Sequence, residues 1–269
     1  MLAAAGVMLM LASGVAYADD AAAQTYLAEN GCVVGPQERM APGASGILPR
    51  LREIASAALA EGRAQRQGDW IVLGPEACTM RPPVIETAFD ATSPAVQRSI
   101  SDIDAHAEIE QQGCFIDSET LQTELMAQDG LSAAEAAVAY YAVLADGVIN
   151  QQMSFFSDDI LRTPAGFQLL TGACAGVPQI EDIRRSQALM LEHFDTLVRD
   201  NARRVRCEEN ASPVSVEVAQ TLSDLTDGAS VNQWTMMDLM LIALGAGWVE
   251  GISDTERGTP RPPICSHVG

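Results

Sequence analysis

The stretch Ala58-Leu59-Ala60-Glu61-Gly62-Arg63-Ala64 has two near counterparts further along the chain. They are Val143-Leu144-Ala145-Asp146-Gly147-Val148-Ile149 and Ala243-Leu244-Gly245-Ala246-Gly247-Trp248-Val249. Each stretch is typical of an apolar helix that stops at a glycine, where a left-handed cap is common. Each also lies between two cysteines, and one recurring order of features is the usual sign of duplicated units. Coincidence is the alternative, because helices that end in glycine are ordinary.

The six cysteines support this division into units. An even number of cysteines in an exported chain favours disulfides, but their spacing alone does not choose among the many pairings. The recurring order of features chooses one set of pairings, because each unit then begins and ends at a cysteine. We expect disulfides within the units, joining the pairs Cys32–Cys78, Cys114–Cys174 and Cys207–Cys265.

The expected fold class is mainly α, with three tandem disulfide-closed helical modules. Apolar side chains between Ile180 and Val205 recur on one face, which predicts an amphipathic helix that starts near Pro178. Ser132 followed by Glu135 has the spacing of a capping box at the start of another helix. We expect module 1 at residues 19–90, module 2 at 91–178 and module 3 at 179–269.

The first 18 residues have the pattern of a cleaved secretory signal. An uncharged apolar run from Met1 to Leu11 precedes Ala16-Tyr17-Ala18, an A-x-A site followed by Asp19. No basic residue precedes the run, so a short membrane anchor is the alternative, but the run is shorter than the roughly 20 residues that span a bilayer. We therefore expect a signal peptide at residues 1–18, a periplasmic or secreted location, and no membrane span after cleavage.

The first module resembles the end of a winged-helix domain. The helix before Gly62 is followed by two short extended runs around Gln67-Gly68, a pattern that predicts a β-hairpin. The resemblance covers the helix and the hairpin, and it is fainter in the other two modules. It implies a fold only, because an exported acidic chain is a poor ligand for DNA.

The formal charge of −20, from 36 acidic residues against 16 bases, limits the partners of the protein. All the bases are arginine. Phosphate backbones and anionic lipid surfaces would repel such a chain, so we expect no nucleic-acid partner. A protein partner is favoured, although a surplus of acidic residues also simply keeps an exported protein in solution.

Two clusters have the residue types of an active or metal site, and each has a plainer explanation. Gly172-Ala173-Cys174-Ala175-Gly176 is similar to a nucleophile elbow with cysteine in place of serine. Pro178 interrupts the helix that an elbow needs, and the repeat assigns Cys174 to a disulfide. Asp102, His106 and Glu110 would share one helix face and could bind a metal, but acidic helix faces are ordinarily just solvated.

Three further groups of side chains have structural explanations beside functional ones. The acidic pairs lack the spacing of a calcium loop and fit solvated loops or helix starts. The methionines fit core packing better than a soft-metal site. The arginine cluster either favours a helix C-terminus or docks an acidic partner. These residues are Asp158, Asp159, Glu181, Asp182, Met236, Met237, Met240, Arg199, Arg203, Arg204 and Arg206.

We therefore expect a non-enzymatic protein-binding or scaffolding protein of the periplasm, with no catalytic residue, no metal site and no cofactor. A stress or envelope protein without a small ligand is indistinguishable from it by sequence. The alternative is a hydrolase-type enzyme with its site in the insertion between Gly147 and Cys174, where polar groups lie beside aromatic rings. These residues are Asn150, Gln151, Gln152, Ser154, Phe155, Phe156, Asp158, Asp159 and Arg162.

Overall fold

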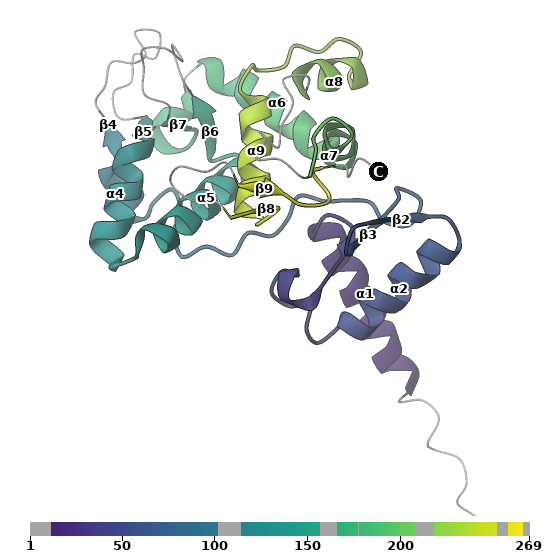
Figure 1. Cartoon of the computed structure of the whole chain (residues 1–269). Helices are drawn as coiled ribbons and strands as arrows, with labels where there is room; N and C mark the ends of the chain where they lie inside the picture. The colour runs from purple at the N-terminus through teal and green to yellow at the C-terminus, as the bar shows by residue number, and fades with distance from the viewer. Residues whose placement is uncertain are drawn as a thin grey trace, which may run out of the picture. The chain divides into compact units, whose positions relative to one another are not determined.

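A computed structural model describes residues 12–101, 114–156, 166–176, 178–207, 218–251 and 258–265 (Figure 1). The chain divides into two compact units, Met1–Arg81 and Pro82–Gly269. Both units combine helices with antiparallel strands. The expectation of a mainly α chain of three tandem helical modules is therefore wrong, because the described residues form a mixed α/β structure. The finer boundaries expected at residues 18, 90 and 178 stay predictions.

The first unit, drawn in purple and blue in Figure 1, packs helices against a three-stranded antiparallel sheet of order β1-β3-β2. The long helix α1 begins at Ala12 and continues past Ala18, so the expected signal cleavage stays a prediction. The elements of this unit are α1 (Ala12–Glu29), β1 (Val33–Val34), the 3-10 turn η1 (Gln37–Arg39), α2 (Leu48–Ala60), β2 (Ala64–Gln67) and β3 (Trp70–Leu73).

The hairpin expected in this unit is confirmed. Helix α2 buries Leu48, Leu51, Ala55 and Ala58, which recur at helical spacing, and Gly62 ends it with a φ of 74°. Strand β2 then pairs with β3 from Ala64↔Leu73 to Gln67↔Trp70. Gly68 supplies the positive φ, 57°, that this tight turn requires.

The second unit holds the remaining helices and two further sheets. Its larger sheet is antiparallel with the order β4-β5-β7-β6, and β8 pairs with β9. Its elements are α3 (Pro94–Arg98), β4 (Ile100–Ser101), β5 (Phe115–Asp117), α4 (Ser118–Asp129), α5 (Ala133–Ile149), β6 (Met153–Phe156), β7 (Gly166–Leu169), the 3-10 turn η2 (Gly172–Gly176), α6 (Pro178–Glu192), α7 (Phe194–Ala202), α8 (Val218–Leu225), α9 (Thr235–Gly245), β8 (Val249–Glu250) and β9 (Thr259–Pro260).

These strands were missing from the expected fold because they are short, and the hairpin strands β6 and β7 are also covered on both faces. All four residues of β7 are buried, as are the first three of β6. A strand buried on both faces has no alternation of apolar and polar residues, and so gives no period-two signal. Gly166 allows β7 to approach β5, because a Cβ there would lie 2.3 Å from the Ile116 carbonyl oxygen.

Three disulfides join the pairs expected from the sequence. They are Cys32–Cys78 in the first unit, and Cys114–Cys174 and Cys207–Cys265 in the second. The regions closed by Cys32–Cys78 and Cys114–Cys174 share one strand arrangement. In each, the strand directly after the first cysteine pairs with the second strand of a hairpin. Strand β1 pairs with β3, and β5 pairs with β7, the second strand of a hairpin in each case.

The glycine shared by the three similar stretches does not occupy equivalent positions. Gly62 and Gly247 have positive φ at the ends of α2 and α9. Gly147 instead lies inside α5, where a Cβ would come within 2.9 Å of the Met153 side chain. The left-handed residue that follows α5 is Gln151, with a φ of 54°. The similarity of the stretches therefore does not reflect one common helix cap.

Helices α5 and α9 form the centre of the second unit and lie side by side (Figure 1). Gly245 makes their close approach possible, because a Cβ there would lie 2.3 Å from the Ala145 Cβ and 2.7 Å from the Tyr141 carbonyl oxygen. Leu144, fully buried on α5, and Ile242, fully buried on α9, belong to the surrounding core.

Replacing Gly245 with alanine should lower the free energy of unfolding by about 2 kcal/mol, because the new methyl group overpacks this contact. The loss should exceed the gain of about 1 kcal/mol that alanine brings to a helix interior. Urea unfolding followed by circular dichroism measures the change. Gly176→Ala is the matched control, because its Cβ would meet nothing within 4 Å. Equal stability of both variants would contradict the close helix contact.

Candidate functional site

An open groove of about 450 Å³ lies between one face of α5 and the chain segment 86–89, within the second unit. Its floor is mostly apolar. Val138 is 72% exposed there, and Val84, just before the segment, is 73% exposed. These are the two most exposed large apolar side chains in the part of the chain that the structure describes. The apolar floor comprises Phe89, Leu131, Ala134, Val138, Ala139 and Ala142.

Helix α5 creates this floor because it is apolar on two faces. Its buried face includes Tyr140 and Leu144, while Val138 and Ala142, one turn apart, face the groove. The helix is anchored at its start by a capping box, in which the Ser132 backbone N–H donates to the Glu135 carboxylate over 2.9 Å. A helix that is apolar all round is normally covered on every side. The open face of α5 is therefore a candidate for binding.

Carboxylates surround this apolar floor. Glu86 and Glu135 line the groove, and hydrogen bonds from Ser132 lower the pKa of Glu135 and keep it ionised. Asp146 lies one turn beyond Ala142 on α5, where burial, and to a smaller extent the charge of Asp90, raise its pKa. The groove lining contains no basic side chain among the described residues.

The charge of the chain is concentrated in this region of the sequence. Residues 82–149 contain 12 acidic residues and one arginine, out of 36 and 16 in the whole chain. The arginine is Arg98, and its Nε already donates to the Glu124 carboxylate over 2.8 Å. Among the described residues, Glu86 and Glu135 line the groove without a basic side chain beside them, so the local potential there is negative.

A second polar feature of this unit is the buried carboxylate of Asp238 on α9, which is 1% exposed. Its Oδ1 accepts from the Phe155 backbone N–H at 2.8 Å, and its Oδ2 accepts from the Ser154 hydroxyl at 2.9 Å. The Gln187 amide on α6 also donates to Oδ2 over 2.9 Å. Asp238 therefore connects α9 to β6 and to α6.

Other buried amide groups lie beside this carboxylate. Gln168 on β7 is directly opposite Ser154 in the sheet, so the two side chains share one face. Both polar atoms of the Gln168 side chain, and Oε1 of Gln187, are buried without a hydrogen-bond partner among the described residues. A neutral Asp238 carries an O–H that needs an acceptor, and these unsatisfied amide oxygens of Gln168 and Gln187 are acceptors in the same buried region. The cluster is therefore suited to hold a protonated carboxyl group in the core.

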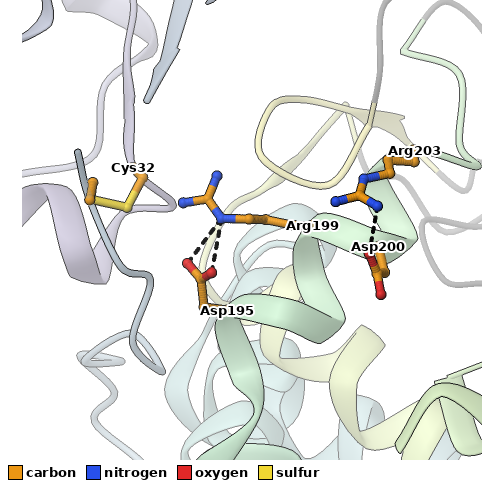
Figure 2. A network of polar contacts seen from close by, with 6 residues as sticks. Cys32, Asp195, Arg199, Asp200 and Arg203 are labelled. Atoms are coloured by element: carbon orange, nitrogen blue, oxygen red, sulfur yellow. Dashed lines mark hydrogen bonds and ion pairs between the residues drawn. A yellow bond between two sulfur atoms is a disulfide. The ribbon is translucent and has the colours of Figure 1, made fainter. Parts of the chain in front are cut away.

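Two of the four arginines in the basic cluster expected on the third part of the chain form ion pairs with nearby acids (Figure 2). On α7, Arg199 Nε lies 2.9 Å from Asp195 Oδ2, and both side chains are mostly buried. Arg203 Nη1 lies 3.1 Å from Asp200 Oδ1 on the same helix. The two arginines shown in Figure 2 are therefore paired with acids of α7 itself, which reduces the positive charge that they offer to an acidic partner.

The catalytic thiol considered from the sequence is ruled out by the structure, because Cys174 forms a disulfide with Cys114. Within the 147–174 insertion, Ser154 and Phe155 contribute to the buried cluster around Asp238 instead of to an open site. Residues 157–165 lie outside the described part of the chain. Asp158, Asp159 and Arg162, which sequence reasoning placed in that site, belong to this segment.

The metal-site hypotheses gain no support from the described residues. Asp102, His106 and Glu110 lie outside them. No group of three or more potential His, Cys, Asp or Glu ligands occurs within the described ranges. On α6, Asp182 pairs with Arg185 in the first turns of the helix. The three methionines of α9 are half-buried, which fits their interpretation as packing residues; they are Met236, Met237 and Met240.

Comparisons with protein-family models, with curated proteins and with solved structures found no match. The resemblance of the first module to winged-helix domains is therefore unsupported by any related structure. Among the described helices, none combines the length and the apolar character that crossing a membrane requires.

Asp238 predicts a distinct pH dependence of stability. Burial raises its pKa to about 7, although hydrogen bonds from Phe155, Gln187 and Ser154 oppose the shift. In the unfolded chain an aspartate titrates near pH ~3.9. The folded state therefore binds the extra proton between these values. The stability that this proton contributes is complete below about pH 4 and is lost as the pH rises towards 7.

The Asp238→Asn variant cannot titrate at this position. The free energy of unfolding of the native protein, minus that of the variant, should fall by roughly 4 kcal/mol between pH 4 and pH 7.5. Denaturant unfolding at a series of pH values measures this difference. A difference that stays constant, or that grows with pH, would show that the carboxylate is ionised in the folded protein.

Proposed function

We propose that this protein binds a partner protein outside the cytoplasm, through the groove between α5 and residues 86–89. The observation that carries this proposal is the exposure of Val138, 72%, at an apolar floor that no described part of the chain covers. Desolvating such a side chain is favourable, and apolar anchors seated in concave sites supply most of the binding energy in protein interfaces.

The charge around the groove indicates the chemistry of the partner. Glu86 and Glu135 line the floor, and residues 82–149 have a surplus of 11 acidic residues over arginine. A bound segment should therefore carry an apolar anchor with arginine or lysine beside it. A second copy of this chain would be repelled, because its total charge is −20.

The location outside the cytoplasm is part of this proposal. Three disulfides stabilise the two units, and disulfides persist in oxidising compartments such as the periplasm. The signal-like residues 1–18 supply a route of export. The acidic charge and the paired arginines of α7 give no support to binding of nucleic acid or of anionic lipid.

A photo-crosslinker in place of Val138 should identify the partner in the native host. We expect a discrete adduct whose crosslinked segment, mapped by mass spectrometry, contains apolar and basic residues. The same crosslinker at Thr123, an exposed position on α4, is the control. No adduct at Val138, equal adducts at both positions, or attachment to an acidic segment would refute the proposal.

Reversing a charge at the groove should weaken the complex found in this way. Glu86→Arg should raise the dissociation constant at least about tenfold and reduce its dependence on salt, because it places a like charge against a basic segment. Glu192→Arg makes the same change of charge at the end of α6, outside the groove. Titration by calorimetry compares the two, and equal affinities would place the partner elsewhere.

A further inference from the structure

The arginines of the first unit reveal a second candidate site that is independent of the groove on α5. Fourteen of the sixteen arginines lie in the described residues, and twelve of these make a polar, electrostatic or ring interaction beyond the backbone bonds of their own helix or strand. The two without such a contact among the described residues are Arg52 and Arg66. Both line the same pocket, of about 410 Å³.

Two arginines without a described carboxylate partner at one pocket are unexpected in a chain with more than twice as many acidic residues as arginines. Half of the described arginines pair with a carboxylate on the same helix or nearby, as Arg50 does with Glu53 and Arg63 with Glu61. Two unpaired guanidinium groups at one pocket therefore leave a local positive charge within an acidic protein. Such a charge attracts an anion.

The pocket has one wall on α2 and another on the sheet. Arg52 and Ser56 lie one turn apart on α2, so they present a guanidinium and a hydroxyl on one face. Opposite them, Val34, Ile71 and Arg66 form one row across β1, β3 and β2. Directly paired residues of a sheet point to the same face, so this row combines two apolar side chains with one positive charge.

The floor of the pocket is held in place by close packing beneath it. Gly35, which also lines the pocket, contacts Trp70 so closely that a Cβ would lie 2.4 Å from the indole ring. Trp70 is 2% exposed, and the Arg39 guanidinium lies 5.3 Å from the centre of its ring. The backbone at this wall therefore has little room to move, as a preformed site requires.

The balance of charges selects among anions. Two arginines and one carboxylate, Asp69, line the pocket, which leaves one net positive charge. A doubly charged phosphate would exceed this charge and would be repelled by Asp69. A single carboxylate matches it, and the planar guanidinium group binds carboxylates through paired hydrogen bonds.

We propose that this pocket binds a carboxylate carried on a small apolar body. Arg52 and Arg66 hold the carboxylate, Ser56 donates a hydrogen bond, and Val34, Pro36 and Ile71 contact the apolar part. The C-terminal carboxylate of a peptide and a free aliphatic acid share this chemistry. Both the size of the pocket and its mixture of apolar and charged lining are typical of small-ligand sites.

Titrations of the full ¹⁵N-labelled chain test this inference with three probes. N-acetyl-leucine stands for a peptide C-terminus, hexanoate for a free aliphatic acid, and N-acetyl-leucinamide has the same apolar body without the charge. We expect the first or the second to shift the amide signals of Val34, Gly35 and Ile71, while the amide compound does not. Tighter binding of N-acetyl-leucine would identify a peptide C-terminus as the ligand, and tighter binding of hexanoate would identify a free aliphatic acid. Both of these outcomes support the proposal.

Variants then assign the binding to the two arginines. Arg52→Gln and Arg66→Gln should each weaken binding of the acid about tenfold, because a charged hydrogen bond is lost. Arg63→Gln is the matched control, since Arg63 is paired with Glu61 outside the pocket. Unchanged amide signals elsewhere in each variant show that the unit is folded. The proposal is overturned if no acid binds, if the amide compound binds equally well, or if Arg52→Gln and Arg66→Gln bind as the control does.

Discussion

The second unit depends on one buried carboxylate, that of Asp238. Three hydrogen bonds reach it from Phe155, Ser154 and Gln187, which belong to two other elements. A charged group with so little exposure is costly unless it is hydrogen-bonded or takes up a proton. The raised pKa, about 7, shows that burial outweighs the hydrogen bonds, so the neutral form is the one the core favours at mildly acid pH.

This constraint extends from the core to the surface. Asp238 fixes α9 against β6 and α6, and α9 in turn packs closely on α5 through Gly245 and Ala145. Val138, two turns before Ala145 on α5, extends into the open groove. The helix that presents the proposed binding surface is therefore held by a close helix–helix contact within the core. A surface on a rigid element loses little conformational entropy when a partner binds.

Much of the covalent framework and of the helix pattern followed from the sequence, but the sheets and the groove did not. The disulfide pairs, the hairpin after Gly62 and the cap formed by Ser132 and Glu135 are local or nearly local features. Strand β7 is buried throughout and gave no alternation. No local pattern in the sequence singled out Asp238, because its partners lie 51 to 84 residues away. Composition did not reveal which face of the apolar α5 stays uncovered.

The most direct test of the role of Asp238 is a ¹³C NMR titration of its carboxyl carbon in the folded protein. An apparent pKa near 7 is expected for this group, because the core excludes water from the carboxylate. A value near the ~3.9 of an exposed aspartate would contradict the account. It would mean that water reaches Asp238, and that the junction of α9, β6 and α6 is not the closed core on which the groove of α5 depends.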